Sequence, residues 1–195
     1  MFFSDNEVIQ TMQMVAHERL DIRTVTMGIS LLDSPGRSRR ELEKHVYDKV
    51  CSRAGRLRET VRTVEERYGI PIVNVRISVT PMSLVCEGLD ESDYVPIAKA
   101  LDRAAADLGV DYIAGYSALV HKGATPGDIR LIQSLPQVLS ETDRICASVN
   151  VATTRAGINM DAVRLMGVTV KSVAEASRDR QGIGCAKLVV FANVP

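Results

Sequence analysis

Two hydrophobic patterns take turns along the chain. Over residues 73–79, valine and isoleucine alternate with asparagine, arginine and serine, which is typical of a strand with one buried face. Over residues 42–68, apolar residues recur at steps of three and four, as on a helix with one apolar stripe. The same alternation continues to the end of the sequence. It predicts strands and helices in strict succession.

The breaks in these patterns set the expected elements. Strands are expected at 22–32, 70–80, 110–120, 145–151 and 185–192. Helices are expected at 5–19, 38–68, 93–108, from Pro126 onward and at 160–177. The long second helix has room for a kink near Gly55, and Pro136 is expected to divide the fourth helix in two.

Five strands joined by helical crossovers predict right-handed βαβ units and a parallel sheet. No linker of disordered composition interrupts residues 21–195, so we expect one α/β domain there. Residues 1–20 form an N-terminal helical extension, whose apolar stripe should dock on the body or on a partner.

Composition narrows the classes of function. Lys plus Arg and Asp plus Glu both number 24, so the formal net charge is zero, which argues against a nucleic-acid partner. Aromatic residues make up only 4%, so platforms for stacking bases are not expected. No apolar run reaches the length of a membrane span, and polar residues interrupt the N-terminal apolar stretch that a signal peptide would need. We therefore expect a cytoplasmic protein that contacts no membrane.

The four cysteines lie far apart and form no Cys-x-x-Cys pair. Such spacing favours buried free thiols over a zinc site or a disulfide framework. The sequence also lacks a Walker loop, a Gly-x-Gly-x-x-Gly turn and a His-Glu-x-x-His helix. We expect no metal and no cofactor.

Polar residues follow each predicted strand, and ligands of parallel α/β folds bind beyond the carboxyl ends of the strands. Hydroxyls, amides and a lysine near Gly-containing turns suit a small anionic metabolite. The candidate ligand-binding residues are Ser30, Thr80, Ser83, Ser117, Lys122, Asn150, Thr153, Thr154, Asn159 and Asn193.

The alternative for most of these residues is ordinary helix capping. Asp33 and Lys122 are the weak candidates for a catalytic acid or base, although Asp33 is also suited to a cap. His121 lies four residues after Ser117, about 13 Å along a strand, so the two do not form a simple dyad.

Five segments resemble an uncharacterised family labelled "PFL family protein", which is similar in fold to the glycyl radical enzymes. They are residues 23–33, 69–74 with 78–81, 115–120, 148–151 with 156–160, and 186–193. The resemblance implies that the chain corresponds to the N-terminal half of a longer relative and forms half of a ten-stranded barrel. It implies no reaction, and nothing here matches the radical loop, so this chain alone should perform no glycyl radical chemistry.

A half-barrel would leave two edge strands and a concave face of strands that look apolar on both sides. We therefore expect self-association, or a second polypeptide that completes the barrel. The leading function is part of a metabolic enzyme that binds a small anionic metabolite at the strand ends. The alternative is a non-catalytic metabolite-sensing or scaffold protein.

Overall fold

The computed structural model of the chain describes residues 4–18, 21–33, 38–89, 91 and 93–192. Five parallel strands pair in the order β1-β2-β3-β4-β7, which confirms the predicted sheet. They are β1 (Ile22–Ile29), β2 (Ile72–Val79), β3 (Tyr112–Leu119), β4 (Ile145–Asn150) and β7 (Leu188–Phe191). The order in the sheet follows the order in the chain, so each strand pairs with the strand before it.

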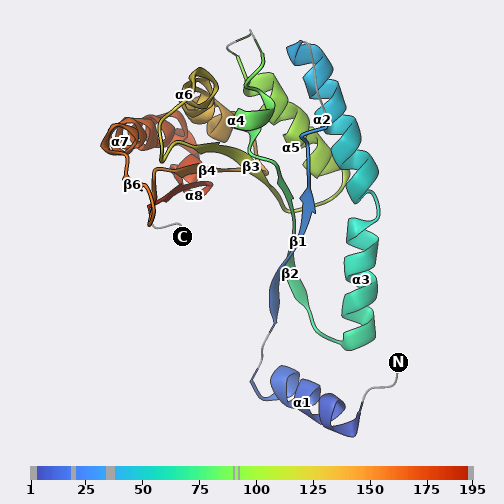
Figure 1. Cartoon of the computed structure of the whole chain (residues 1–195). Helices are drawn as coiled ribbons and strands as arrows, with labels where there is room; N and C mark the ends of the chain where they lie inside the picture. Colours follow the sequence, from blue (N-terminus) through green and yellow to red (C-terminus); the bar gives the residue numbers. More distant parts are fainter. Residues whose placement is uncertain (1–3, 19–20, 34–37, 90, 92, 193–195) are drawn as a thin grey trace.

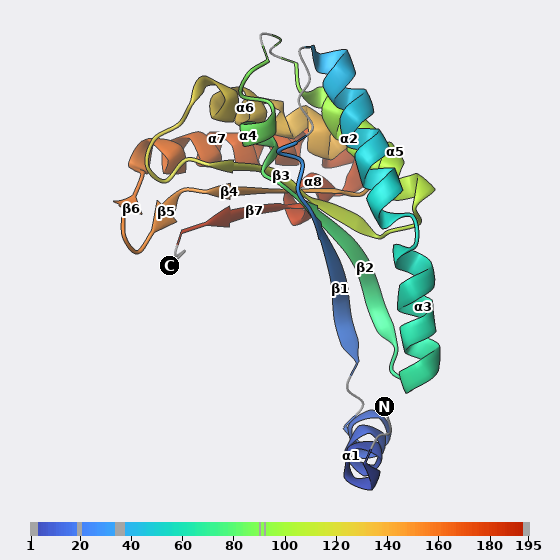
Figure 2. The same ribbon diagram turned by 45° about the vertical axis from the view of Figure 1, so that its right-hand side comes forward.

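Helices connect the strands. They are α2 (Arg39–Ala54) with α3 (Leu57–Tyr68), α4 (Met82–Val85) with α5 (Val95–Asp107), α6 (Pro126–Glu141), and α7 (Met160–Ala176) with the short η1 (Arg178–Arg180) and α8 (Ile183–Ala186). Right-handed crossovers that always step in the same direction place all helices on one side of a sheet. Figures 1 and 2 show this result: the sheet curves strongly, its convex side carries the helices, and no helix of the described residues covers its concave side.

The core lies between the sheet and these helices. Val75, Ile77 and Val79 of β2 are buried toward the helices, as the alternation predicted. The intervening Arg76 and Ser78 point to the other side of the sheet, because side chains alternate along a strand. Side chains of paired residues on neighbouring strands point to the same side of the sheet. On β3 and β4 the pairs are Ala114 with Cys146 and Ser117 with Ser148.

We call this uncovered side the open face. The pairing register assigns to it Thr26, Gly28, Arg76, Ser78, Tyr112, Ala114, Ser117, Cys146, Ser148, Val189 and Phe191. Most of these side chains are small or polar, whereas the sequence suggested apolar residues on both faces. The difference arises because the valines of β2 and β4 all occupy the helix-facing positions.

Three predicted elements differ in detail. The helix expected at 38–68 is broken at Gly55 and Arg56 into α2 and α3. Pro136 does not divide α6, which is one helix; Leu135, Val138 and Leu139 are fully buried around it, and that burial outweighs the roughly 3 kcal/mol that an interior proline costs. The fifth strand begins at Leu188 because the residues before it form α8.

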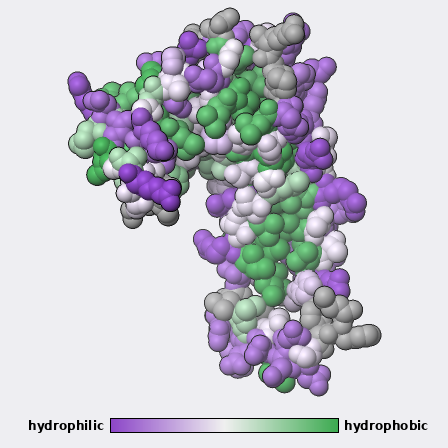
Figure 3. Space-filling model, in the orientation of Figure 1, coloured by the Kyte–Doolittle hydropathy of each residue, from purple (hydrophilic) through white to green (hydrophobic). Residues whose placement is uncertain are grey.

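Helix α1 (Asp5–Ala16) begins with a capping box, in which Ser4 and Glu7 bind each other's backbone N–H groups. Its apolar side chains Val8, Ile9 and Met12 are exposed, so α1 does not bury them against the body. Figure 1 shows α1 beyond the start of β1, and Figure 3 shows hydrophobic surface over the neighbouring part of the β1–β2 pair. Within the described ranges, no helix is long and apolar enough to cross a membrane.

Candidate functional site

Parallel pairing puts the carboxyl ends of all five strands at one edge of the sheet, so the predicted residues that follow them share that edge. Several already bind other parts of the protein. The Thr80 hydroxyl accepts the N–H of Leu31 at 3.0 Å and so joins the ends of β1 and β2. The Ser117 and Ser148 hydroxyls share a hydrogen bond of 2.8 Å between β3 and β4.

The two predicted amides at this edge also support the backbone. Asn159 donates to the carbonyl of Val120 at 2.7 Å and caps α7 by accepting the N–H of Ala162. Asn150 is buried; its carbonyl oxygen accepts the N–H of Ala152, and its amide nitrogen lies 3.4 Å from Nδ1 of His121. Their main contribution is to hold the loops after β3 and β4 in place.

The remaining predicted residues form no common cluster. Thr153 accepts the N–H of Ala156 beside the short hairpin of β5 (Ala152–Thr153) and β6 (Gly157–Ile158), and Lys122 and Thr154 are exposed. Ser83 is 1% exposed, and its hydroxyl has no hydrogen-bond partner among the described residues. Asn193 lies outside the described residues.

A cleft of about 270 Å³ at this edge lies beside the first turns of α6 and α7. Its polar side chains include Asn159 and the carboxylate of Asp161, and the rest of its lining is mainly apolar. The start of α6 already holds two carboxylates of the protein, because Glu87 and Asp128 both accept hydrogen bonds from the Thr125 hydroxyl. These negative charges occupy the positions that an anionic ligand would need.

Asp33 and Ser30 lie elsewhere, at the outer edge of β1. They line a pocket of about 340 Å³ together with Lys49 and Arg53 of α2. The Lys49 ammonium donates a hydrogen bond to the Asp33 carboxylate and forms an ion pair with it. That hydrogen bond lowers the pKa of Asp33, whereas a general base working near neutral pH needs a raised one.

A larger groove of about 490 Å³ lies on the open face, toward the amino ends of β3, β4 and β7. We call it the open-face groove. The strands β2, β3, β4 and β7 and the helix α8 contribute to its wall, and its apolar floor includes Val189 and Phe191. Its lining residues are Arg76, Tyr112, Ala114, Asp143, Cys146, Ala147, Ser148, Ile183, Ala186, Lys187, Val189 and Phe191.

Arg76 brings a charge without a counter-ion to this groove. Its guanidinium lies over the Tyr112 ring, 5.4 Å from the ring centroid. Within the described parts of the chain it has no hydrogen bond or ion pair, and its Nε is buried without a partner. A guanidinium carries five N–H donors and suits planar or tetrahedral oxyanions, so this geometry is open to an anion.

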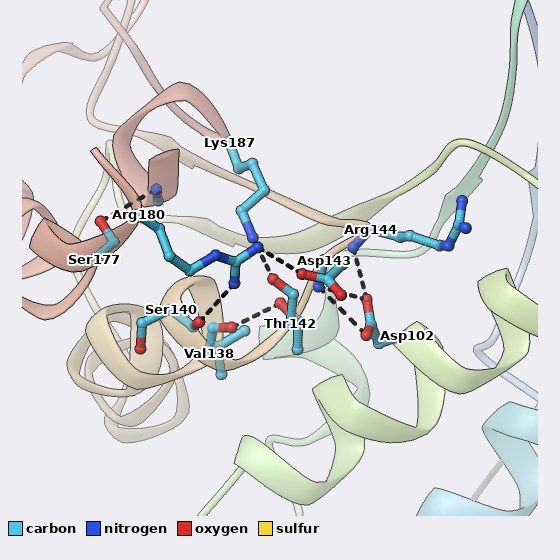
Figure 4. Close-up of polar contacts among 10 residues, drawn as sticks. Asp102, Val138, Ser140, Thr142, Asp143, Arg144, Ser177, Arg180 and Lys187 are labelled. Carbon is cyan, nitrogen blue, oxygen red and sulfur yellow. Dashed lines mark hydrogen bonds and ion pairs between the residues drawn. The ribbon is translucent and has the colours of Figure 1, made fainter. Parts of the chain in front are cut away.

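Lys187 supplies a second cation, at the start of β7. Its side chain is buried, and its ammonium donates to the carbonyl of Thr142 just after α6 (Figure 4). Burial is the main cause that lowers the pKa of Lys187, and the nearby Arg180 lowers it further, whereas Asp102, Asp143 and Cys146 act in the opposite direction. The acid of the groove, Asp143, is engaged elsewhere: Arg180 binds its carboxylate at 2.6 Å.

Cys146 lies between the two cations. Burial raises the pKa of its thiol, and the positive charges of Arg76 and Lys187 act in the opposite direction. Arg76, Cys146 and Lys187 all line the groove, and β4, which carries Cys146, pairs with β7. Among the residues that the structure describes, no group of three or more His, Cys, Asp or Glu side chains could hold a metal ion.

Sequence reasoning missed Arg76, Cys146 and Lys187. Arg76 is one of the polar residues that alternate with valine and isoleucine over residues 73–79, and such residues usually face solvent. Lys187 was taken as part of a strand that begins at 185. The one signal that pointed to the groove was the small and polar set of Arg76, Ser78, Cys146 and Ser148, at alternate positions on two strands.

In a comparison with known proteins, relatives from one family match nearly the whole chain. A UPF0210 protein of Halothermothrix orenii is 56% identical over 189 residues, which are 97% of this chain and 42% of that protein. A UPF0210 protein of Methanosarcina acetivorans is 55% identical over 192 residues, or 98% and 41% of the two chains. The chain therefore spans about two fifths of the length of these curated relatives.

These matches correct the resemblance to the PFL family, which is wrong: the relatives are UPF0210 proteins, and a likeness to glycyl radical enzymes is not supported. The parallel sheet does not depend on that resemblance, because it was predicted from the alternation of strands and helices. A family model described as "Uncharacterised ACR (DUF711)" matches residues 13–195. By this match and these identities, the chain belongs to the DUF711 family of UPF0210 proteins.

Proposed function

We propose that this chain binds a small anionic metabolite in the open-face groove, as part of a metabolic enzyme. One observation carries the proposal: the half-buried guanidinium of Arg76 has no hydrogen-bond or ion-pair partner among the described residues. A charge that loses part of its hydration needs a partner, and a bound anion would supply it.

The surroundings of Arg76 favour the same ligand class. Lys187 adds a second positive charge, while the carboxylate of Asp143 is neutralised by Arg180. Val189, Phe191 and the Tyr112 ring offer apolar contact to the rest of a ligand. At about 490 Å³ the groove has the size of a small-molecule site. The carboxyl-edge cleft is a weaker candidate because its charged lining residue is Asp161.

Titration calorimetry with propionate and with inorganic phosphate tests this proposal. Arg76→Gln keeps a polar side chain of similar length but removes the charge. A hydrogen bond to a charged group contributes about 1.5–3 kcal/mol, so the substitution should weaken binding by roughly 10- to 100-fold. Arg103→Gln, an exposed position on α5, is the matched control and should bind as the unchanged protein does. If Arg76→Gln binds both probes with the same affinity as the unchanged protein, the proposal is refuted.

A second proposal concerns what covers the open face, and it also applies to the non-catalytic scaffold alternative. Parallel sheets are normally covered on both faces, whereas this one has helices on its convex side alone. Among the described residues, no further strand pairs with the outer edge of β1 or of β7. We propose that a second copy of the chain or a second polypeptide unit packs against the open face and closes the groove.

A further inference from the structure

Lys187 differs from an ordinary surface lysine in position and in partners. Lys187 is one of the residues that line the open-face groove, and it is only 6% exposed. Within the described residues its ammonium forms no ion pair with a carboxylate; its hydrogen bond goes to the neutral carbonyl of Thr142. Figure 4 shows this amine beside Thr142 and Asp143.

The charged groups around Lys187 leave its amine without a dedicated counter-ion. Asp143 is held by Arg180, and the carboxylate of Asp102 accepts the backbone N–H groups of Asp143 and Arg144. Burial is the largest influence on Lys187 and disfavours its charged form, which lowers its pKa. A larger fraction of the amine is then neutral, and the neutral amine is the nucleophilic form.

Arg76 and Lys187 are placed to act on one small molecule. Their strands are three intervals apart in the sheet, or about 14 Å between backbones. Both side chains are long, and both influence the thiol of Cys146, which lies on the strand next to β7. Both residues line the same groove, so the guanidinium and the amine can approach neighbouring carbon atoms of one small ligand.

We propose that Lys187 is a nucleophile that forms an imine with a small 2-oxo acid, whose carboxylate binds Arg76. This inference rests on the proposed anion site and names its substrate class. The amine nitrogen attacks the carbonyl carbon, and one proton moves from nitrogen to oxygen to give a carbinolamine. Loss of the former carbonyl oxygen as water, with the second amine proton, leaves the carbon–nitrogen double bond. No oxidant or other reactant is consumed.

Borohydride trapping tests the imine directly. The protein is incubated with pyruvate, reduced with sodium borohydride, and analysed by intact mass and peptide mapping. One reduced adduct on the peptide that contains Lys187 is expected. Lys187→Arg keeps the positive charge and a donor for the Thr142 carbonyl but cannot form an imine, so it should lose the adduct. Lys171→Arg, an exposed lysine of α7, is the matched control and should keep it.

The outcomes separate this inference from the proposed function. If propionate binds through Arg76 but pyruvate gives no adduct at Lys187, the imine is refuted and the anion site stands. If neither propionate binding nor an adduct is found, both proposals fail. An adduct of equal yield on Lys171, or one that persists in Lys187→Arg, refutes the inference as well. If the unchanged protein traps no adduct and a folded Lys187→Met variant is less stable, the imine is refuted. The role of Lys187 is then structural, through its hydrogen bond between the start of β7 and the residue after α6.

Discussion

Gly115 lies where β3 changes its register against β4. Its φ of +121° belongs to the region that favours glycine. A Cβ atom at this position would lie 2.5 Å from both the carbonyl oxygen and a methyl group of Val79 on the neighbouring strand. Only a residue without a side chain allows β2 and β3 to approach this closely in the centre of the sheet.

Gly115→Ala should therefore destabilise the protein by about 2–3 kcal/mol, from backbone strain and the clash with Val79. Gly28→Ala is the matched control, since it adds the same methyl group on β1 where no atom lies within 4 Å. That change should alter stability by less than about 1 kcal/mol. Chemical denaturation measures both. Similar losses for the two variants would mean that the register shift does not depend on glycine.

At the residue scale, the sequence was informative about which side chains are buried and much less so about their partners. The alternation over 73–79 showed that Arg76 faces away from Val75 and Ile77. It could not show whether a carboxylate from another strand would reach Arg76, because that depends on pairing register and sheet curvature. For the same reason the sequence did not show the hydrogen-bond partners of the candidates at the carboxyl edge of the sheet. Thr80 and Asn159 were correctly placed at strand or helix ends, and their bonds to Leu31 and Val120 come from segments distant in sequence.

At the element scale, local rules predicted helix starts better than helix interiors. Helix α6 was expected to begin at Pro126 and α7 at residue 160; both starts are confirmed. Pro136 was expected to break α6, but tertiary burial outweighed its local preference. The short α8 was missed because a four-residue helix carries no periodic pattern.

Asn159 joins two elements, and its two functions can be separated. Asn159→Ala removes both the cap on α7 and the bond to the Val120 carbonyl, so the free energy of unfolding should fall by about 2 kcal/mol. Asn159→Ser retains a capping oxygen and should lose only about 1 kcal/mol. Urea unfolding of the three proteins gives these values. Equal losses for Ala and Ser would show that the cap contributes nothing measurable.

At the scale of the whole molecule, the open face is the dominant feature. At its β7 end Val189 is 49% exposed and Phe191 45%, next to an edge with which no other strand pairs in the described part of the chain. Exposed strand edges and apolar surface promote association. Association was expected from the half-barrel that the resemblance implied; the face that the structure leaves uncovered is more polar than that expectation assumed.

The isolated chain should therefore associate at micromolar concentration, through an interface larger than roughly 1,000 Å². Phe191→Glu places a charge on the open face and should shift the sedimentation profile toward the monomer. Val168→Glu, an equally drastic change at an exposed position on α7, should leave the profile unchanged. A protein that sediments as a monomer at every concentration, with cooperative unfolding, would contradict the expectation.

The match between strand order and chain order has a consequence for synthesis on the ribosome. Each new strand docks on the edge formed by the strand made just before it, and no strand is inserted later between two earlier ones. Successive βα units can thus settle in the order of translation, each burying its apolar side as it emerges. Ribosome-bound chains that end after β3 or β4 should already protect β1 and β2 from proteolysis.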